Sequence, residues 1–183
     1  MSIPCFQPGR TIHGISAVLL PYLADYRPDW ESFRRLLDRS WAAGITPAVN
    51  MDTGYVNLLT EAERRRVLAE TADVAAGRPF VAGAFIEGAT GDAARLYLAE
   101  VQSIRRMGGR PILFQSSALT SRDDDGIVGI YREVAAEGGP LLAFELGTMF
   151  APFGRIYSDD LYARLLDIEP IVGAKHSSLD RVV

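Results

Sequence analysis

Residues 108–115 read Gly-Gly-Arg-Pro-Ile-Leu-Phe-Gln, and this stretch indicates how the whole chain is built. A glycine supplies the left-handed backbone conformation that ends a helix. A proline is tolerated at the start of a strand, where no ladder donor is required. The apolar run that follows is typical of a strand buried on both faces of a parallel sheet. The stretch therefore predicts a helix end followed directly by a buried strand.

The same glycine–proline pattern recurs at Gly44/Pro47, Gly77/Pro79, Gly109/Pro111 and Gly139/Pro140. Strands are predicted over residues 15–20, 47–50, 79–86, 111–115, 140–146 and 170–175. Their starts are about 30 residues apart, which is the length of one βα unit. The helices between them begin at residues suited to cap a helix: Asp29, Thr60 with Glu63 as a capping box, Asp92, the run Asp123–Asp125, and Ser158.

Strands that alternate with helices predict a parallel sheet, which is either open and doubly wound or closed into a (β/α)8 TIM barrel. No G-x-G-x-x-G motif follows the first strand, and the even repeat favours the barrel. A barrel needs eight strands and about 250 residues. We therefore expect residues 1–183 to form a single barrel domain that is incomplete at the C-terminus, with the remainder absent or supplied by another chain.

The composition limits the class of protein. The 183 residues are 48% hydrophobic with a net charge of −4, which gives no basic surface for nucleic acid. No apolar run reaches about 18 residues, so no membrane span is expected. The N-terminus lacks a secretory signal, and the single Cys5 has no partner for an internal disulfide. These features predict a cytoplasmic protein.

Lys175 is the only lysine beside eighteen arginines. A lysine amine can lose its proton and attack a carbonyl to form a Schiff base, whereas a guanidinium stays charged. If strand side chains alternate, Ile171 and Gly173 face inward with Lys175, and Val172 and Ala174 face the helices. An apolar cavity around the amine would lower its pKa. The alternative is a solvated lysine that closes a strand.

In a barrel, reactive groups lie at the C-terminal ends of the strands and in the loops that follow. This rule selects Asn50–Tyr55, Glu87, Ser116 and Ser117, Phe144 and Glu145, and Lys175. The spacing of His13, His176 and Cys5 indicates no metal site. The arginine pairs and triplets at 34–35 and 64–66 are interpreted as solvated charge on helix faces.

Residues 171–178, Ile-Val-Gly-Ala-Lys-His-Ser-Ser, resemble the Schiff-base segment of the dihydrodipicolinate synthase/N-acetylneuraminate lyase family. Residues 14–22, 51–55 and 79–83 resemble other blocks of that family in the same order, so the resemblance runs from about residue 14 to the end. It implies a class I aldolase-type TIM barrel in which Lys175 forms an imine with pyruvate or another 2-oxo acid. It further implies a homo-oligomer and no cofactor beyond the lysine imine.

The family's substrate-binding loop is represented by Met51–Tyr55, with departures. The resemblance implies that Thr53 and Gly54 hold the substrate carboxylate. Asp52 stands where the family has a first threonine, and Tyr55 stands where it has a glutamate.

The family's proton relay is altered. Phe144 occupies the place of a tyrosine, Ala118 and Leu119 replace a tyrosine pair, and His176 replaces an acidic residue. Schiff-base formation needs a proton donor for the departing hydroxyl, and Glu145 is the first candidate, followed by Asp52 and Tyr55.

Each of these residues also has a structural interpretation. Glu145 is alternatively a carboxylate paired with an arginine, Asp52 a loop or cap residue, Tyr55 a packing residue at the rim, and His176 a structural neighbour of the lysine.

The resemblance thus implies a Schiff-base lyase or aldolase, and the absence of the family tyrosines indicates that its reaction is not dihydrodipicolinate synthesis itself. The alternative is a catalytically altered barrel that binds a small carboxylate as a sensor or structural subunit.

Overall fold

The computed structural model describes residues 8–9 and 11–177, so Cys5 and residues 178–183 lie outside the described part. Six parallel strands pair in sequential order. They are β1 (Ile15–Ala17), β2 (Thr46–Val49), β3 (Val81–Ala84), β4 (Arg110–Leu113), β5 (Leu141–Phe144) and β6 (Ile171–Lys175). The helices are α1 (Trp30–Ala42), α2 (Glu61–Ala75), α3 (Ala93–Arg106), α4 (Ser117–Thr120), α5 (Asp124–Gly138) and α6 (Asp159–Leu166), with 3-10 turns η1 (Asp52–Gly54) and η2 (Val56–Leu58).

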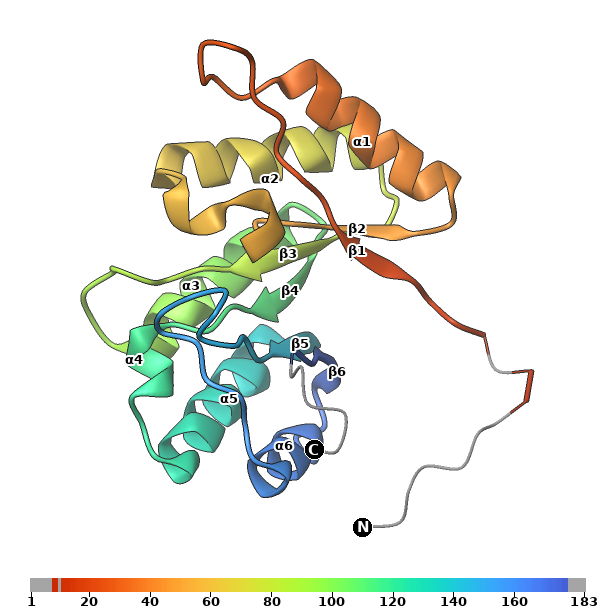
Figure 1. The fold of residues 1–183 in the computed structure, drawn as a ribbon. Helices are drawn as coiled ribbons and strands as arrows, with labels where there is room; N and C mark the ends of the chain where they lie inside the picture. Colours follow the sequence, from red (N-terminus) through yellow and green to blue (C-terminus); the bar gives the residue numbers. More distant parts are fainter. Residues whose placement is uncertain (1–7, 10, 178–183) are drawn as a thin grey trace.

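The sheet curls into a half-barrel with its helices on the outside. Figure 1 shows the strands through the middle of the molecule, with α1 and α2 above them and α5 and α6 below. An open doubly wound sheet reverses its strand order at a switch point, whereas here each strand pairs with the next in sequence. The predicted (β/α) barrel class is therefore confirmed, and α4, η1 and η2 are additions that the sequence did not predict.

Two apolar clusters lie on opposite faces of this sheet. The helix-side cluster joins buried residues of α1–α3, α5 and α6 to alternate strand residues such as Ala82, Leu113 and Ala143. The interior cluster contains no residue of α1–α6 and takes the intervening strand residues, including Val81, Ile112 and Phe144. This alternation places the side chains of the interior cluster on the face that a barrel encloses.

The helix starts agree with the predicted caps. The side chains of Asp29, Asp92, Asp123 and Ser158 each accept a backbone N–H from the first turn of the following helix. Thr60 and Glu63 form both hydrogen bonds of a capping box at the start of α2. Each cap contributes on the order of 1 kcal/mol to stability. The Asp123–Asp125 run is thus a helix start.

Two expectations about the outer parts of the fold are wrong. The apolar residues 15–20 are typical of a strand buried on both faces, but Ile15 is 48% exposed and β1 pairs only with β2 among the described residues. Arg64 was interpreted as solvated, but its guanidinium lies over the Phe85 ring at 5.0 Å and donates to the Leu59 carbonyl. Sequence pattern identifies which face of a helix is polar, but not which polar side chain folds back onto the loops.

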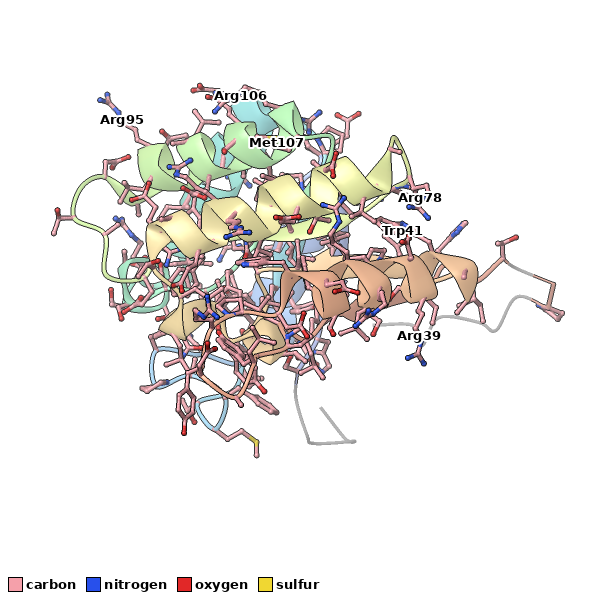
Figure 2. All side chains as sticks on the ribbon, turned by 90° about the horizontal axis from the view of Figure 1, so that it is seen from above. Arg39, Trp41, Arg78, Arg95, Arg106 and Met107 are labelled. Atoms are coloured by element: carbon pink, nitrogen blue, oxygen red, sulfur yellow. The ribbon has the colours of Figure 1, made fainter. Side chains whose placement is uncertain are left out.

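The outer surface of the helices is rich in arginine. Figure 2 shows Arg78 beside Trp41, where the guanidinium lies 4.1 Å from the ring centroid, while Arg95 and Arg106 extend from α3. Arg34 of α1 bridges Glu70 and Asp73 of α2. In the described part of the chain, none of the helices has the length and apolar character that crossing a membrane requires.

Candidate active site

Lys175 is the last residue of β6, and an irregular pairing decides where it points. Leu141 pairs with Ile171, but Ala143 pairs with Ala174 and Phe144 with Lys175, so β6 contains one extra residue. Such a bulge shifts the alternation of side chains beyond it by one position. Ile171 consequently lies in the helix-side cluster, whereas Lys175 is paired with Phe144 of the interior cluster. The prediction that Ile171 and Lys175 face the same way is wrong.

The amine of Lys175 contacts two groups near the end of the sheet. Nζ donates to Ser177 Oγ at 3.1 Å and lies 4.3 Å from the centroid of the Phe144 ring. A cation over an aromatic face is stabilised by the ring quadrupole. The residue is exposed, so the expected apolar enclosure is not formed by the described residues.

Glu145 follows Phe144 and lies on the opposite face of β5. Its side chain is fully buried and accepts the backbone N–H groups of Tyr157 and Ser177 at 3.0 and 3.1 Å. Its own backbone N–H donates to the Lys175 carbonyl at 3.1 Å. Glu145 is therefore tied by hydrogen bonds to the β5–α6 loop and to the segment after β6, and no arginine pairs with it in the described part of the chain.

His176 points from β6 toward Glu145. Nδ1 lies 2.5 Å from Glu145 Oε1, an oxygen that also accepts the Ser177 N–H. The imidazole meets the Tyr162 ring edge-on, with centroids 5.6 Å apart. Burial, and then the charge of Glu145, raise the pKa of Tyr162 to about 12. His176 thus packs between a carboxylate and a phenol that stays neutral at physiological pH.

The loop after β2 contains the other predicted site residues. Thr53 is exposed in η1, and Gly54 is buried where an added Cβ would lie 3.0 Å from the Val18 carbonyl oxygen. Asp52 Oδ1 is buried without a hydrogen-bond partner among the described residues. Close packing of Gly54 on the end of β1 therefore holds Thr53 at the rim.

Residues with a positive φ stand at both ends of this loop. Asn50 has a φ of 52° and Tyr55 a φ of 61°, values that non-glycine residues adopt at a cost of about 1–3 kcal/mol. Asn50 Nδ2 donates to the Arg64 carbonyl, while the Tyr55 ring is 41% exposed and lies 6.2 Å from that of Tyr22. Backbone strain of this kind is typical of ligand-binding loops.

The carboxylate of Glu87 joins the segment after β3 to the start of α4, which follows β4. Glu87 accepts hydrogen bonds from the backbone N–H and the hydroxyl of Ser117, at 2.6 and 2.8 Å. Ser116 Oγ instead lies 2.9 Å from the buried Tyr97 hydroxyl. Leu119, which stands in the place of a family tyrosine, is completely buried. This part of the rim is held by its own hydrogen bonds.

The structure therefore divides the predicted site residues into two groups. Lys175, Phe144, Glu145 and His176 are brought together at the β5–β6 end, whereas Asp52, Thr53, Gly54 and Tyr55 form the β2 loop. Among residues 8–9 and 11–177, no hydrogen bond joins the two groups, and no cluster of three or more His, Cys, Asp or Glu side chains is arranged to hold a metal ion.

Two polar residues of the site were not singled out from the sequence. Ser177 contacts the lysine amine, and its position two residues after Lys175 on the same side of the chain could have identified it. Gln115 is buried and fixes the β5–α6 loop through the backbone of Leu146 and Arg155. No local sequence signal points to these contacts, because they lie 31 and 40 residues away along the chain.

Comparisons with solved structures support the fold. No protein-family model matches the chain, and a search of curated proteins also finds no match. Many solved structures share its fold, among them dihydrodipicolinate synthase from Acinetobacter baumannii in complex with pyruvate. That match has a TM-score of 0.72 and 23% identity, and it covers 91% of this chain and 55% of the other.

Two further solved structures share the fold. Dihydrodipicolinate synthase from Thermotoga maritima matches with a TM-score of 0.74 and 17% identity over 93% of this chain and 57% of its own. N-acetylneuraminate lyase from Mycoplasma synoviae matches with a TM-score of 0.68 and 16% identity over 92% and 55%. This chain thus spans little more than half the length of these structures, and it has the fold of one part of the dihydrodipicolinate synthase and N-acetylneuraminate lyase barrels.

Proposed function

We propose that this chain belongs to the dihydrodipicolinate synthase/N-acetylneuraminate lyase family and acts as a Schiff-base lyase or aldolase on pyruvate or another 2-oxo acid. The observation that carries the proposal is the position of Lys175 at the C-terminal end of β6, on the interior side of the sheet. Reactive groups of barrel enzymes lie at that end of their strands. A neighbour with the same fold holds pyruvate.

The proposed reaction begins at the amine. The nitrogen of neutral Lys175 attacks the carbonyl carbon of the 2-oxo acid, and the carbonyl oxygen takes up the proton that the nitrogen gives up. The resulting hydroxyl then takes a second proton from solvent and leaves as water, while the C=N bond of the protonated imine forms. Thr53 and Gly54 are proposed to hold the substrate carboxylate, and no other cofactor takes part.

Trapping with borohydride tests the proposal directly. The full chain is incubated with pyruvate and with a series of other 2-oxo acids, reduced, and weighed intact. Because Lys175 is the only lysine, we expect one stable adduct that disappears in Lys175→Arg, a variant that keeps the positive charge. Absence of an adduct with every acid, or an equal adduct on Lys175→Arg, would falsify the enzymatic function.

A specific observation supports a second candidate, a barrel that binds a small carboxylate without catalysis. Phe144 lies directly against the amine in the place of the family tyrosine and carries no hydroxyl to pass a proton. This candidate predicts that pyruvate raises the thermal midpoint of wild type and of Lys175→Arg equally, with no trapped adduct. Homo-oligomerisation and a cytoplasmic location remain expectations.

A further inference from the structure

We propose that Glu145 and His176 form a positioning pair that sets the Ser177 hydroxyl against the Lys175 amine. The inference rests on the proposed function, since it concerns the same lysine. It assigns Glu145 a role different from direct proton transfer, because its carboxylate lies on the helix side of β5 while Lys175 is paired on the interior side.

The first step in the argument is the burial of Glu145. Its side chain has no exposed surface, and a buried carboxylate is tolerated only when its oxygens are hydrogen-bonded. Two backbone N–H groups, those of Tyr157 and Ser177, donate to its oxygens, and His176 Nδ1 contacts Oε1 at 2.5 Å. These donors come from the β5–α6 loop and the segment after β6, so one side chain fixes both segments.

The second step is that Glu145 holds both ends of a three-residue segment. Its backbone N–H donates to the Lys175 carbonyl, and its carboxylate accepts the Ser177 N–H, each at 3.1 Å. Side chains alternate along an extended backbone. These two hydrogen bonds fix residues 175–177 at both ends, and the side chain of His176 lies on the helix side of the sheet. Lys175 and Ser177 therefore point to the interior side, where Lys175 Nζ and Ser177 Oγ lie 3.1 Å apart.

The third step concerns the ring of His176. Its side chain is about half exposed, so burial alone does not hold it. The 2.5 Å contact with Glu145 and the perpendicular packing on Tyr162 set its orientation instead. Removing the imidazole would remove the contacts with Glu145 Oε1 and Tyr162 and would free the backbone at position 176. Ser177 would then leave the amine.

The experiment uses the single lysine as its own reporter. The full chain is labelled with lysine that carries ¹³C at Cε. Because Lys175 is the only lysine, the ¹³C NMR spectrum contains one lysine Cε resonance. Wild type is compared with Glu145→Gln, His176→Ala, His176→Asn and Ser177→Ala, and each variant's fold is checked by circular dichroism. Trapping rates with pyruvate and borohydride are measured on the same samples.

We expect His176→Ala and Glu145→Gln to move the resonance toward its position in Ser177→Ala and to slow trapping about tenfold, because misplaced reacting groups lose rate. His176→Asn should restore both values, since its Nδ2 can take the place of Nδ1 against Glu145 Oε1. A wild-type resonance in folded His176→Ala overturns the proposal, as does a failure of His176→Asn to restore it. If Glu145→Gln does not fold, the two His176 variants still decide the question. If no 2-oxo acid reacts, the proposed function fails, while the resonance still tests the positioning pair.

Discussion

The two halves of the candidate site are built in different ways. At the β5–β6 end, the buried carboxylate of Glu145 accepts two backbone hydrogen bonds and contacts His176 Nδ1, while Lys175 Nζ donates to Ser177 Oγ and lies over the Phe144 ring. In the β2 loop, buried side-chain oxygens of Asn50 and Asp52 accept none among the described residues. The nucleophile is thus held by side-chain hydrogen bonds, and the loop by backbone packing.

The difference predicts which kind of substitution damages each half. Removing a hydrogen-bonding group should matter at the β5–β6 end, whereas adding volume at a close backbone contact should matter at the β2 loop. Three predictions, from the largest expected effect to the smallest, test this comparison.

Gly83→Ala should have the largest effect on stability. A Cβ at Gly83 of β3 would lie 2.1 Å from the backbone oxygen of Asn50, where the β2 loop begins. Because neither backbone can move freely, we expect the free energy of unfolding to fall by about 3 kcal/mol or more, measured by urea denaturation. Gly129→Ala on the exposed side of α5 is the control, since nothing lies within 4 Å of its Cβ, and it should stabilise by about 0.5–1 kcal/mol. Equal results for the two variants would contradict the packing argument.

The carboxylates of the two halves should respond differently to amide substitution. Glu145→Gln places an NH2 group against a backbone N–H, so we expect a loss of about 1–3 kcal/mol in the free energy of unfolding. Asp52→Asn removes no hydrogen bond of the buried oxygen and should change stability by less than about 0.5 kcal/mol. Urea unfolding of both variants at neutral pH measures the difference. An Asp52→Asn loss as large as that of Glu145→Gln would remove the distinction between the halves.

Alkaline pH should weaken the β5–β6 end through Tyr162. Its folded-state pKa is raised to about 12, against about 10 when unfolded, so the folded chain keeps a proton that the unfolded chain loses. The stability from this neutral phenol is fully present below pH 10 and is lost as pH rises toward 12. Tyr162→Phe should therefore lose less stability over this range than wild type. Tyr26→Phe, whose ring is 88% exposed, is the control and should follow wild type.

Much of the fold was predictable because its signals are local. The caps at Asp29, Thr60, Asp92, Asp123 and Ser158 each depend on a residue three positions away, and all five have their side-chain hydrogen bonds. The glycine–proline pattern likewise marks each strand entry from neighbouring residues. Parallel pairing in sequential order then follows from the repeat.

The errors and omissions arise where residues far apart in the sequence determine a side chain's partner, its direction or its exposure. The contacts of Glu145 with Tyr157 and Ser177 join residues 12 and 32 positions apart, so the sequence identified the carboxylate but not its partners. The inward position of Ile171 was wrong because alternation was counted along β6 alone, while the extra residue is visible only against β5. The exposure of β1 depends on which strands lie beside it, which its own apolar residues do not reveal.

The extra residue in β6 has a consequence for how this site can change. The bulge decides which face carries the amine, because β6 places three residues between Ile171 and Lys175 where β5 has two between Leu141 and Phe144. If all five residues of β6 paired regularly from Ile171, Ala174 would lie opposite Phe144, and Lys175 would face the helices while His176 faced inward. Loss of a single residue at Val172 or Gly173 would instead remove the bulge and leave Lys175 opposite Phe144. In this chain, the choice between a lysine and a histidine on the inner side of the sheet is therefore set by one extra residue within one strand.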